Sequence, residues 1–191
     1  RFMKLKVALI STLAQSLKKC FLGALIFVIS IVYSLHSFSN VGKQPEGAIR
    51  AAFIFNIMKY TQWETPPADV VGICVAGDAA SGSYLQKFEA LEFRGKAINI
   101  HMFDDVKRLM DSCDVVVLGI HETSALDESL FNRSRLVICD GCEDGLKQAA
   151  VEIAKHDERR LKFSVNLLHA QRAKIKFGSA MLEIAANVVK E

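Results

Sequence analysis

Four short runs rich in Val and Ile recur along the chain, and amphipathic stretches separate them. The runs lie at 70–77, 97–103, 114–120 and 135–140. Continuous apolar runs of this length indicate strands that are buried on both faces. Helical spacing of apolar residues marks the stretches 81–92, 104–112 and 123–132. This alternation predicts an α/β fold, a three-layer sandwich with a mostly parallel sheet flanked by helices.

The stretch 47–63 is apolar on nearly every helical face. It predicts a helix that stops before the Pro-Pro pair at 66–67. Up to position 60 its only charged residues are Arg50 and Lys59. Such a helix must bury more than one face, either inside the core of its own chain or against another chain.

The C-terminal part breaks the strand–helix alternation. Residues 151–167 contain two alternating runs around a polar turn, which predicts a β-hairpin or strand pair. Residues 179–190 predict a closing helix. We therefore expect a single domain over 47–191, preceded by a linker at 40–46.

The first 39 residues are organised as an export signal. Arg1–Lys19 carries five basic residues and no acid, and residues 20–35 follow without a charge. Ser37 and Ser39 then provide the small residues that a signal peptidase reads. A spanning helix needs about 20 apolar residues. We therefore predict a cleaved signal peptide at 1–39, with an uncleaved anchor as the alternative.

The predicted signal peptide, or leader, also accounts for the net positive charge of the chain. The formal net charge is +3, from 24 basic and 21 acidic residues. Five of the basic residues and none of the acids lie in the leader, so the remainder carries 19 − 21 = −2. This balance argues against a basic surface for nucleic acid, and we expect no nucleic-acid partner.

Four cysteines follow the leader: Cys74, Cys113, Cys139 and Cys142. An even number in an exported domain implies disulfides, although the count alone allows three connectivities. We interpret Cys139 and Cys142 as a structural disulfide, with a redox-active pair or half of a metal site as alternatives. The two acids after Cys142 disfavour a reactive thiolate, and there is no second C-x-x-C for zinc. Cys74 and Cys113 then remain as the second pair.

Motifs for catalysis are missing from the sequence. It contains neither G-x-S-x-G nor H-E-x-x-H. We expect no enzyme activity, no cofactor and no metal. Trp63, the single tryptophan, is either a core residue at a helix end or an aromatic anchor at an interface or ligand cleft.

Several segments of the chain together carry a family resemblance. They are AAFIFNIMKYTQWE (51–64), ICVAGDAASG (73–82), FRGKAINIHMF (93–103), CDVVVLGI (113–120), RLVICDGCEDG (135–145) and LKFSVNLLHAQRAKIKFGSAMLEIA (161–185). In this order and spacing they resemble the YfiR-like family of exported bacterial proteins. The resemblance covers essentially residues 47–188.

The resemblance implies a periplasmic α/β protein that forms a homodimer. It implies binding to the periplasmic sensory domain of an inner-membrane diguanylate cyclase, which is held inactive until envelope or redox stress. Cyclic-di-GMP output, and with it biofilm regulation, would then depend on this protein. Relatives similar at their cysteines carry two intrachain disulfides, one of which would join Cys74 to Cys113.

We assign partner or dimer contacts to two segments, the apolar helix and the segment 152–170. The residues are Ile54, Phe55, Met58, Trp63, Glu152, Phe163 and Val165. Other functions stay open beside the repressor. One is a sensor of a small solute, an aromatic amino acid or a nucleotide, at the loops after the strands. Others are a thiol oxidoreductase that uses Cys139 and Cys142, and an accessory to an envelope complex.

Overall fold

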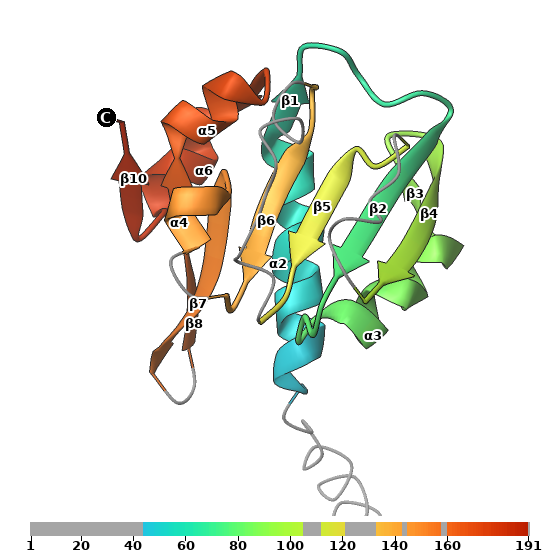
Figure 1. Cartoon of the computed structure of the whole chain (residues 1–191), viewed down its shortest axis with the longest axis horizontal. Helices are drawn as coiled ribbons and strands as arrows, with labels where there is room; N and C mark the ends of the chain where they lie inside the picture. The colour runs from blue at the N-terminus through green and yellow to red at the C-terminus, as the bar shows by residue number, and fades with distance from the viewer. Residues whose placement is uncertain (1–43, 105–111, 121–132, 143–144, 158–159, 191) are drawn as a thin grey trace, which may run out of the picture. The chain divides into compact units, whose positions relative to one another are not determined.

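An eight-stranded sheet runs through the domain, and helices pack against it (Figure 1). The computed structural model describes residues 44–104, 112–120, 133–142, 145–157 and 160–190. The strands follow the order β10-β8-β7-β6-β5-β2-β4-β3 across the sheet. Their bounds are β2 (Val70–Ala76), β3 (Glu92–Phe93), β4 (Lys96–Phe103), β5 (Val115–Leu118), β6 (Leu136–Asp140), β7 (Val151–Asp157), β8 (Arg160–Asn166) and β10 (Asn187–Val189).

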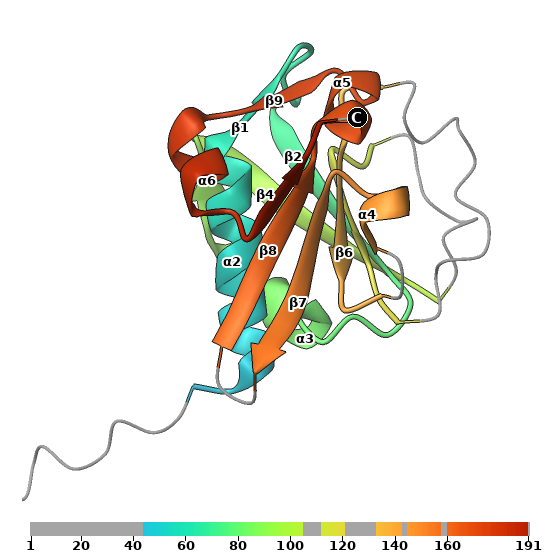
Figure 2. The ribbon, with the colours of Figure 1, turned by 90° about the vertical axis from the view of Figure 1, so that its left-hand side faces the viewer.

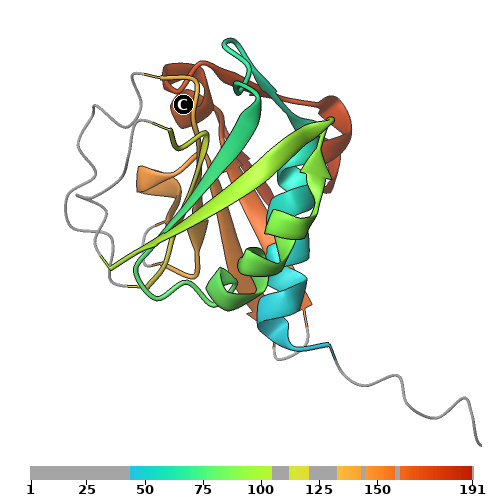
Figure 3. The ribbon, with the colours of Figure 1, turned by 90° about the vertical axis from the view of Figure 1, so that its right-hand side faces the viewer.

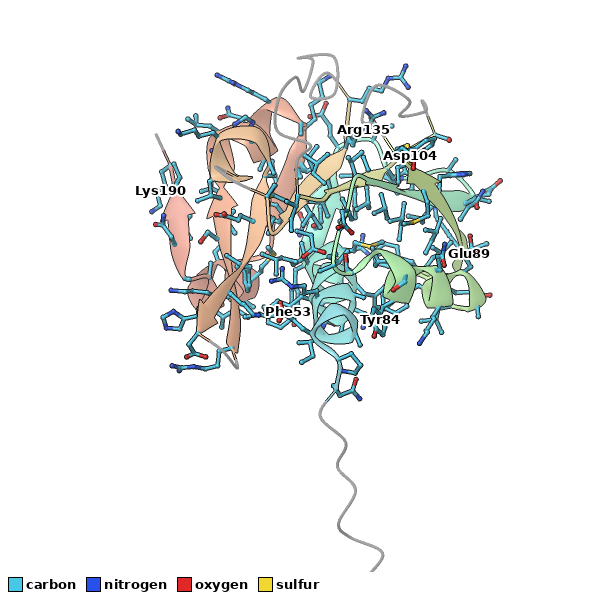
Figure 4. The ribbon with its side chains drawn as sticks, turned by 60° about the horizontal axis from the view of Figure 1, so that its bottom comes forward. Phe53, Tyr84, Glu89, Asp104, Arg135 and Lys190 are labelled. Atoms are coloured by element: carbon cyan, nitrogen blue, oxygen red, sulfur yellow. A yellow bond between two sulfur atoms is a disulfide. The ribbon has the colours of Figure 1, made fainter. Side chains whose placement is uncertain are left out.

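The centre of the sheet is parallel, as the sequence predicts. β4, β2, β5, β6 and β7 all run in one direction, and β2, β5 and β6 are buried on both faces. β7 and β8 form the predicted hairpin, β10 lies parallel to β8, and β3 lies antiparallel to β4. Figure 4 shows Lys190, which follows β10, and Glu89, which precedes β3, at opposite ends of the sheet.

Helices cover the two faces of the sheet unequally. α2 (Glu46–Tyr60) and α6 (Ser179–Ile184) lie on one side, and α4 (Gly145–Gln148) lies on the other (Figure 2). The predicted helical stretch 81–92 is formed by α3 (Gly82–Leu85) and the 3-10 helix η2 (Gln86–Ala90), which lie beside α2 (Figure 3). The helices predicted at 104–112 and 123–132 fall almost wholly outside the described residues.

The contacts of helix α2 explain why it is apolar on nearly every face. Ile54 and Met58 are fully buried against the sheet. On one flank Phe55 packs on Phe88 of η2, with ring centroids 5.1 Å apart, and on the other Phe53 packs on Phe163 of β8 at 6.3 Å. The core of the same chain therefore covers the helix toward the sheet and on both flanks. A contact of its remaining side with another chain, the second alternative left open by the sequence, stays a prediction.

The helix predicted over 47–63 is too long by three residues. It ends at Tyr60, and Thr61–Trp63 forms β1, which pairs antiparallel with β9 (Ile175–Phe177). The Thr61 hydroxyl donates to the Ile57 carbonyl at 2.9 Å and so closes the last turn. Thr and Trp favour extended backbone, and the distant strand β9 supplies the hydrogen-bonding partner.

The closing helix predicted over 179–190 is also too long. α6 ends at Ile184, and Asn187–Val189 forms β10 beside Ser164–Asn166 of β8. The Ala186 amide donates to the Phe163 carbonyl at 2.8 Å, which starts this ladder. The β-branched pair at 188–189 fits an extended edge strand better than a helix end.

Residues Gln44–Glu191 form one of the two compact units of the chain. The other unit, Arg1–Lys43, contains the predicted signal peptide and most of the predicted linker, and it lies outside the described residues. Within the described part of the chain, no helix is both long and apolar enough to span a membrane.

Candidate functional site

The four cysteines lie on one face of the sheet and form two disulfides. Cys74 of β2 is bonded to Cys113 just before β5, and Cys139 at the end of β6 is bonded to Cys142. The Cα atoms are 5.6 Å apart in each pair, and no cysteine is more than 6% exposed. This face, with its own apolar cluster, is called the disulfide face below.

The Cys139–Cys142 bridge closes a tight loop at the carboxyl end of β6. Gly141 within it has φ +86°, a conformation that side chains with a Cβ rarely adopt. The Cys142 amide donates to the Cys139 sulfur at 3.1 Å. Gly145, the first residue of α4, packs so closely that a Cβ there would lie 2.5 Å from that sulfur. Buried sulfurs in a packed loop fit the structural disulfide and not an exposed redox pair.

Asp140 lies between the two cysteines and is 1% exposed. Its carboxylate accepts from Arg50 Nη1 at 2.7 Å and from the Ser81 amide at 2.9 Å. One side chain therefore joins β6, helix α2 and the segment after β2. Burial by itself lowers the pKa of Arg50, but the hydrogen bonds and charges of Asp140 and, to a smaller extent, Glu46 together outweigh it, and the pKa of Arg50 is raised.

The Arg50 guanidinium extends this arrangement toward β7. It donates to the Ile153 carbonyl at 3.2 Å and pairs with Glu46 at 2.8 Å. Glu46 in turn pairs with Lys155 of β7 at 2.8 Å. We call Asp140, Arg50, Glu46 and Lys155 the ion-pair network. Sequence reasoning missed it, although Arg50 was already conspicuous as one of two charges in an apolar helix.

The carboxyl ends of the strands, where a solute site was expected, are closely packed in the described residues. Asp140 ties the end of β6 to Ser81, and an isolated bridge joins Asp78 to Ile120 beyond β2 and β5. A Cβ at Gly119 would lie 2.3 Å from the Asp78 backbone. The predicted solute site at this edge stays a prediction.

A cavity of about 630 Å³ lies instead near the opposite ends of the strands, between α5 (Leu167–Arg172) and the β1–β9 pair. We call it the β1–β9 cavity. Figure 1 shows α5 and β1 at the end of the sheet where the parallel strands begin. The apolar part of its lining consists of Trp63, Leu167, Ala170, Ile175 and Phe177.

Contacts with Phe93 and Arg94, at the β3–β4 turn, hold the Trp63 side chain in place. Its ring meets Phe93 edge-on, with centroids 6.1 Å apart, and the Arg94 guanidinium lies 5.8 Å from its centre. Arg94 also donates to the Lys59 and Thr61 carbonyls, at 2.9 and 3.1 Å. The Trp63 Nε1 atom is buried and has no hydrogen-bond partner. Trp63 is therefore a buried residue just after a helix end, as the first interpretation has it, and it also lines the cavity. Its role as an aromatic anchor for a ligand or partner stays a prediction.

Most residues that we assigned to partner or dimer contacts lie in the core. Ile54, Met58 and Val165 are 0% exposed, and Phe163 is 6% exposed. Phe55 and Glu152 are half-buried, and Glu152 lies close to Gly145 on the disulfide face. These burials leave little side-chain surface for a second chain, so a contact surface has to be sought among the exposed neighbours.

Among the described residues, no group of three or more His, Cys, Asp or Glu side chains could hold a metal ion. The arrangement defines a class of protein: an α/β domain with one sheet face stapled by two buried disulfides, as in domains of oxidising compartments. The chain belongs to the YfiR/HmsC-like family, whose model matches residues 47–186. This family consists of periplasmic regulators rather than enzymes. No curated protein matches the chain.

Proposed function

We propose that this protein is exported to the periplasm, binds the periplasmic sensory domain of an inner-membrane diguanylate cyclase and represses that enzyme. Membership of the YfiR/HmsC-like family over residues 47–186 carries the proposal. The predicted leader at 1–39 and the two buried disulfides support it, because thiols become bridges in an oxidising compartment.

The outer end of the β7–β8 hairpin is the proposed contact surface for the cyclase. β10 covers Ser164–Asn166 on the outer side of β8. Arg160–Lys162 pairs with β7 on the inner side, and on its outer side the described residues place no strand. An extended segment of the partner could add to this short edge. The surrounding side chains are exposed and charged, among them Asp157 and Arg160, which pair at 2.7 Å.

The ion-pair network supports a link between the disulfide face and this surface. The Cys139–Cys142 loop positions Asp140, Asp140 holds Arg50, and Arg50 with Glu46 contacts Ile153 and Lys155 of β7. Breaking the bridge would free the backbone on both sides of Asp140. We therefore propose that reduction loosens the hairpin and releases the cyclase, in the way that redox stress would relieve repression.

A homodimer stays a prediction of the family resemblance. Three large apolar side chains provide a surface for it on the α2–α6 side of the sheet: Ile49, Tyr60 and Ile184, at 37, 47 and 71% exposed. Sedimentation of the purified protein measures the oligomeric state. Replacing Ile184 by Glu should shift a dimer toward monomer without unfolding it, because the side chain is exposed.

The proposed repression is tested by co-purification and by output. The protein should co-purify with the periplasmic domain of a diguanylate cyclase from the same organism, and deletion of its gene should raise cyclic-di-GMP. Reversing the hairpin charges with Arg160→Glu should weaken co-purification, whereas the matched control Lys87→Glu on η2 should not. Co-purification that is unaffected by reductant would remove the redox step, and cyclic-di-GMP that is unaffected by deletion would refute repression itself.

A further inference from the structure

The β1–β9 cavity has the size and composition of a small-molecule site. Its volume of about 630 Å³ lies in the range of known ligand pockets. Five of its ten lining residues are apolar, and the other five are polar or charged: Gln62, Glu64, Gln171, Lys174 and Lys176. Apolar surface combined with placed polar groups is typical of sites that fix the orientation of a ligand.

Trp63 lines this cavity as an apolar residue. It is 8% exposed, and its Nε1 atom is buried and closed to water-sized groups, so a ligand in the cavity does not reach the indole N–H. Trp63 therefore contributes apolar surface to the wall and no hydrogen bond.

The charged groups of the lining are predominantly cationic. Lys174 and Lys176 both line the cavity, and Glu64 is the one carboxylate of the lining. Both lysines are exposed, and neither forms an ion pair with a carboxylate in the described part of the chain. The cavity thus has a positive rim and an apolar wall.

Lys174 also occupies a backbone position that favours glycine. Its φ is +51°, just after α5, where helices commonly end on glycine. The conformation is held because its amide donates to the Gln171 carbonyl and its carbonyl accepts from the Glu64 amide, both at 3.0 Å. A lysine here costs stability that glycine would save, and it adds a cationic side chain to a residue that lines the cavity.

We propose that the β1–β9 cavity binds a small organic anion, a carboxylate with an apolar body. Lys174 and Lys176 attract the carboxylate, and the apolar wall, Trp63 included, receives its body. The site is separate from the proposed cyclase contact, so it can be tested whether or not repression is correct.

Matched ligands test the chemistry of this site. Trp63 is the only tryptophan of the chain, so its selectively excited fluorescence reports on the cavity itself. Octanoate should change this fluorescence in a saturable way. Octanol, which lacks the charge, and the α-amino derivative of octanoate, which adds an opposing one, should each bind about tenfold more weakly or worse. Equal affinity for octanoate and octanol would overturn the proposal, as would the absence of any saturable change with octanoate.

Matched variants test the residues. Lys174→Gly should weaken octanoate binding about tenfold or more while the melting temperature stays the same or rises, because glycine relieves the positive φ. The control Lys162→Gln, on β8 and outside the cavity lining, removes the same charge and should bind octanoate normally. If both variants bind as tightly as the unaltered protein, the lysine rim plays no part and the proposal fails. A variant that loses binding but keeps its melting temperature has lost the site and not the fold.

Discussion

Removal of the Cys74–Cys113 bridge should destabilise the protein more than removal of the Cys139–Cys142 bridge. The comparison uses two double variants, Cys74→Ala/Cys113→Ala and Cys139→Ala/Cys142→Ala. Each deletes two sulfur atoms from buried positions, at 0 and 3% exposure in one pair and 0 and 6% in the other. The packing free energy lost with the sulfur atoms should therefore be nearly the same in both variants. It should nearly cancel when their free energies of unfolding are compared.

The loops that the two bridges close differ about tenfold in length. Cys74 and Cys113 are separated by 39 positions along the chain, and Cys139 and Cys142 by 3. On the chain-entropy account the longer loop contributes about 4 kcal/mol to the free energy of unfolding and the shorter about 2 kcal/mol. The expected difference between the variants is therefore about 2 kcal/mol.

Urea unfolding followed by circular dichroism, without reductant, measures both free energies. The slopes should be fitted separately, because an open chain exposes more surface when it unfolds. A Cys139→Ala/Cys142→Ala variant that loses as much as the other, or more, would refute the entropic reasoning. The short bridge would then stabilise the native state directly, through its hold on Asp140 and the ion-pair network.

Three further predictions concern single side chains. Asp140→Asn should cost about 3–5 kcal/mol, because it leaves the buried Arg50 guanidinium without its counter-charge, and the double variant Arg50→Met/Asp140→Asn should lose less than the sum of the two single changes. Asn166 accepts from the first amides of α5 and donates to the Leu146 carbonyl at 2.7 Å. Asn166→Ala should cost about 2 kcal/mol and Asn166→Ser less, because serine keeps the helix cap. Burial lowers the pKa of His169, so the unfolded chain takes up the proton more readily, and stability should fall as the pH drops below about 6.5.

Urea titrations measure the free energy of unfolding that all three predictions concern. Each prediction has its own contradictory outcome. Additive losses in the Arg50 and Asp140 cycle would show that the two groups do not interact. Equal losses for Asn166→Ala and Asn166→Ser would mean that the cap contributes nothing. For His169, the decline on acidification should be shallower in His169→Gln, and an unchanged decline would assign it to other groups.

The strands of the sheet centre were predictable because their signal is local. β2, β5 and β6 coincide with three of the apolar runs, since a strand buried on both faces must be apolar throughout. β4 coincides with the fourth run, but the prediction that it is buried on both faces is wrong, because its burial alternates and one face is largely exposed. The hairpin of β7 and β8 was predictable for a similar reason, since its alternation repeats on both sides of a polar turn. The cysteine pairs followed from there being four cysteines and one close pair, and the structure contains that pairing.

The errors occur where a distant segment decides the outcome. Residues 61–63 and 187–189 were assigned to helices, yet both are strands because β9 and β8 offer them a partner. Local propensity distinguishes poorly between a helix end and a three-residue strand. Four of the assigned contact residues, Ile54, Met58, Phe163 and Val165, are buried in their own chain, because an apolar helix or strand has no sequence mark for the side that its own core will cover. The partner and dimer contacts themselves stay predictions.

By itself the sequence determined the central strands, their parallel direction, the hairpin and the family, because each depends on patterns within a few tens of residues. Only the tertiary structure decided that Asp140 meets Arg50, 90 positions away, and that Trp63 and Lys174 line one cavity. Long-range pairs form when packing offsets the entropy of closing the loop between them. That balance depends on the whole fold, so no local sequence pattern indicates which distant residues will meet.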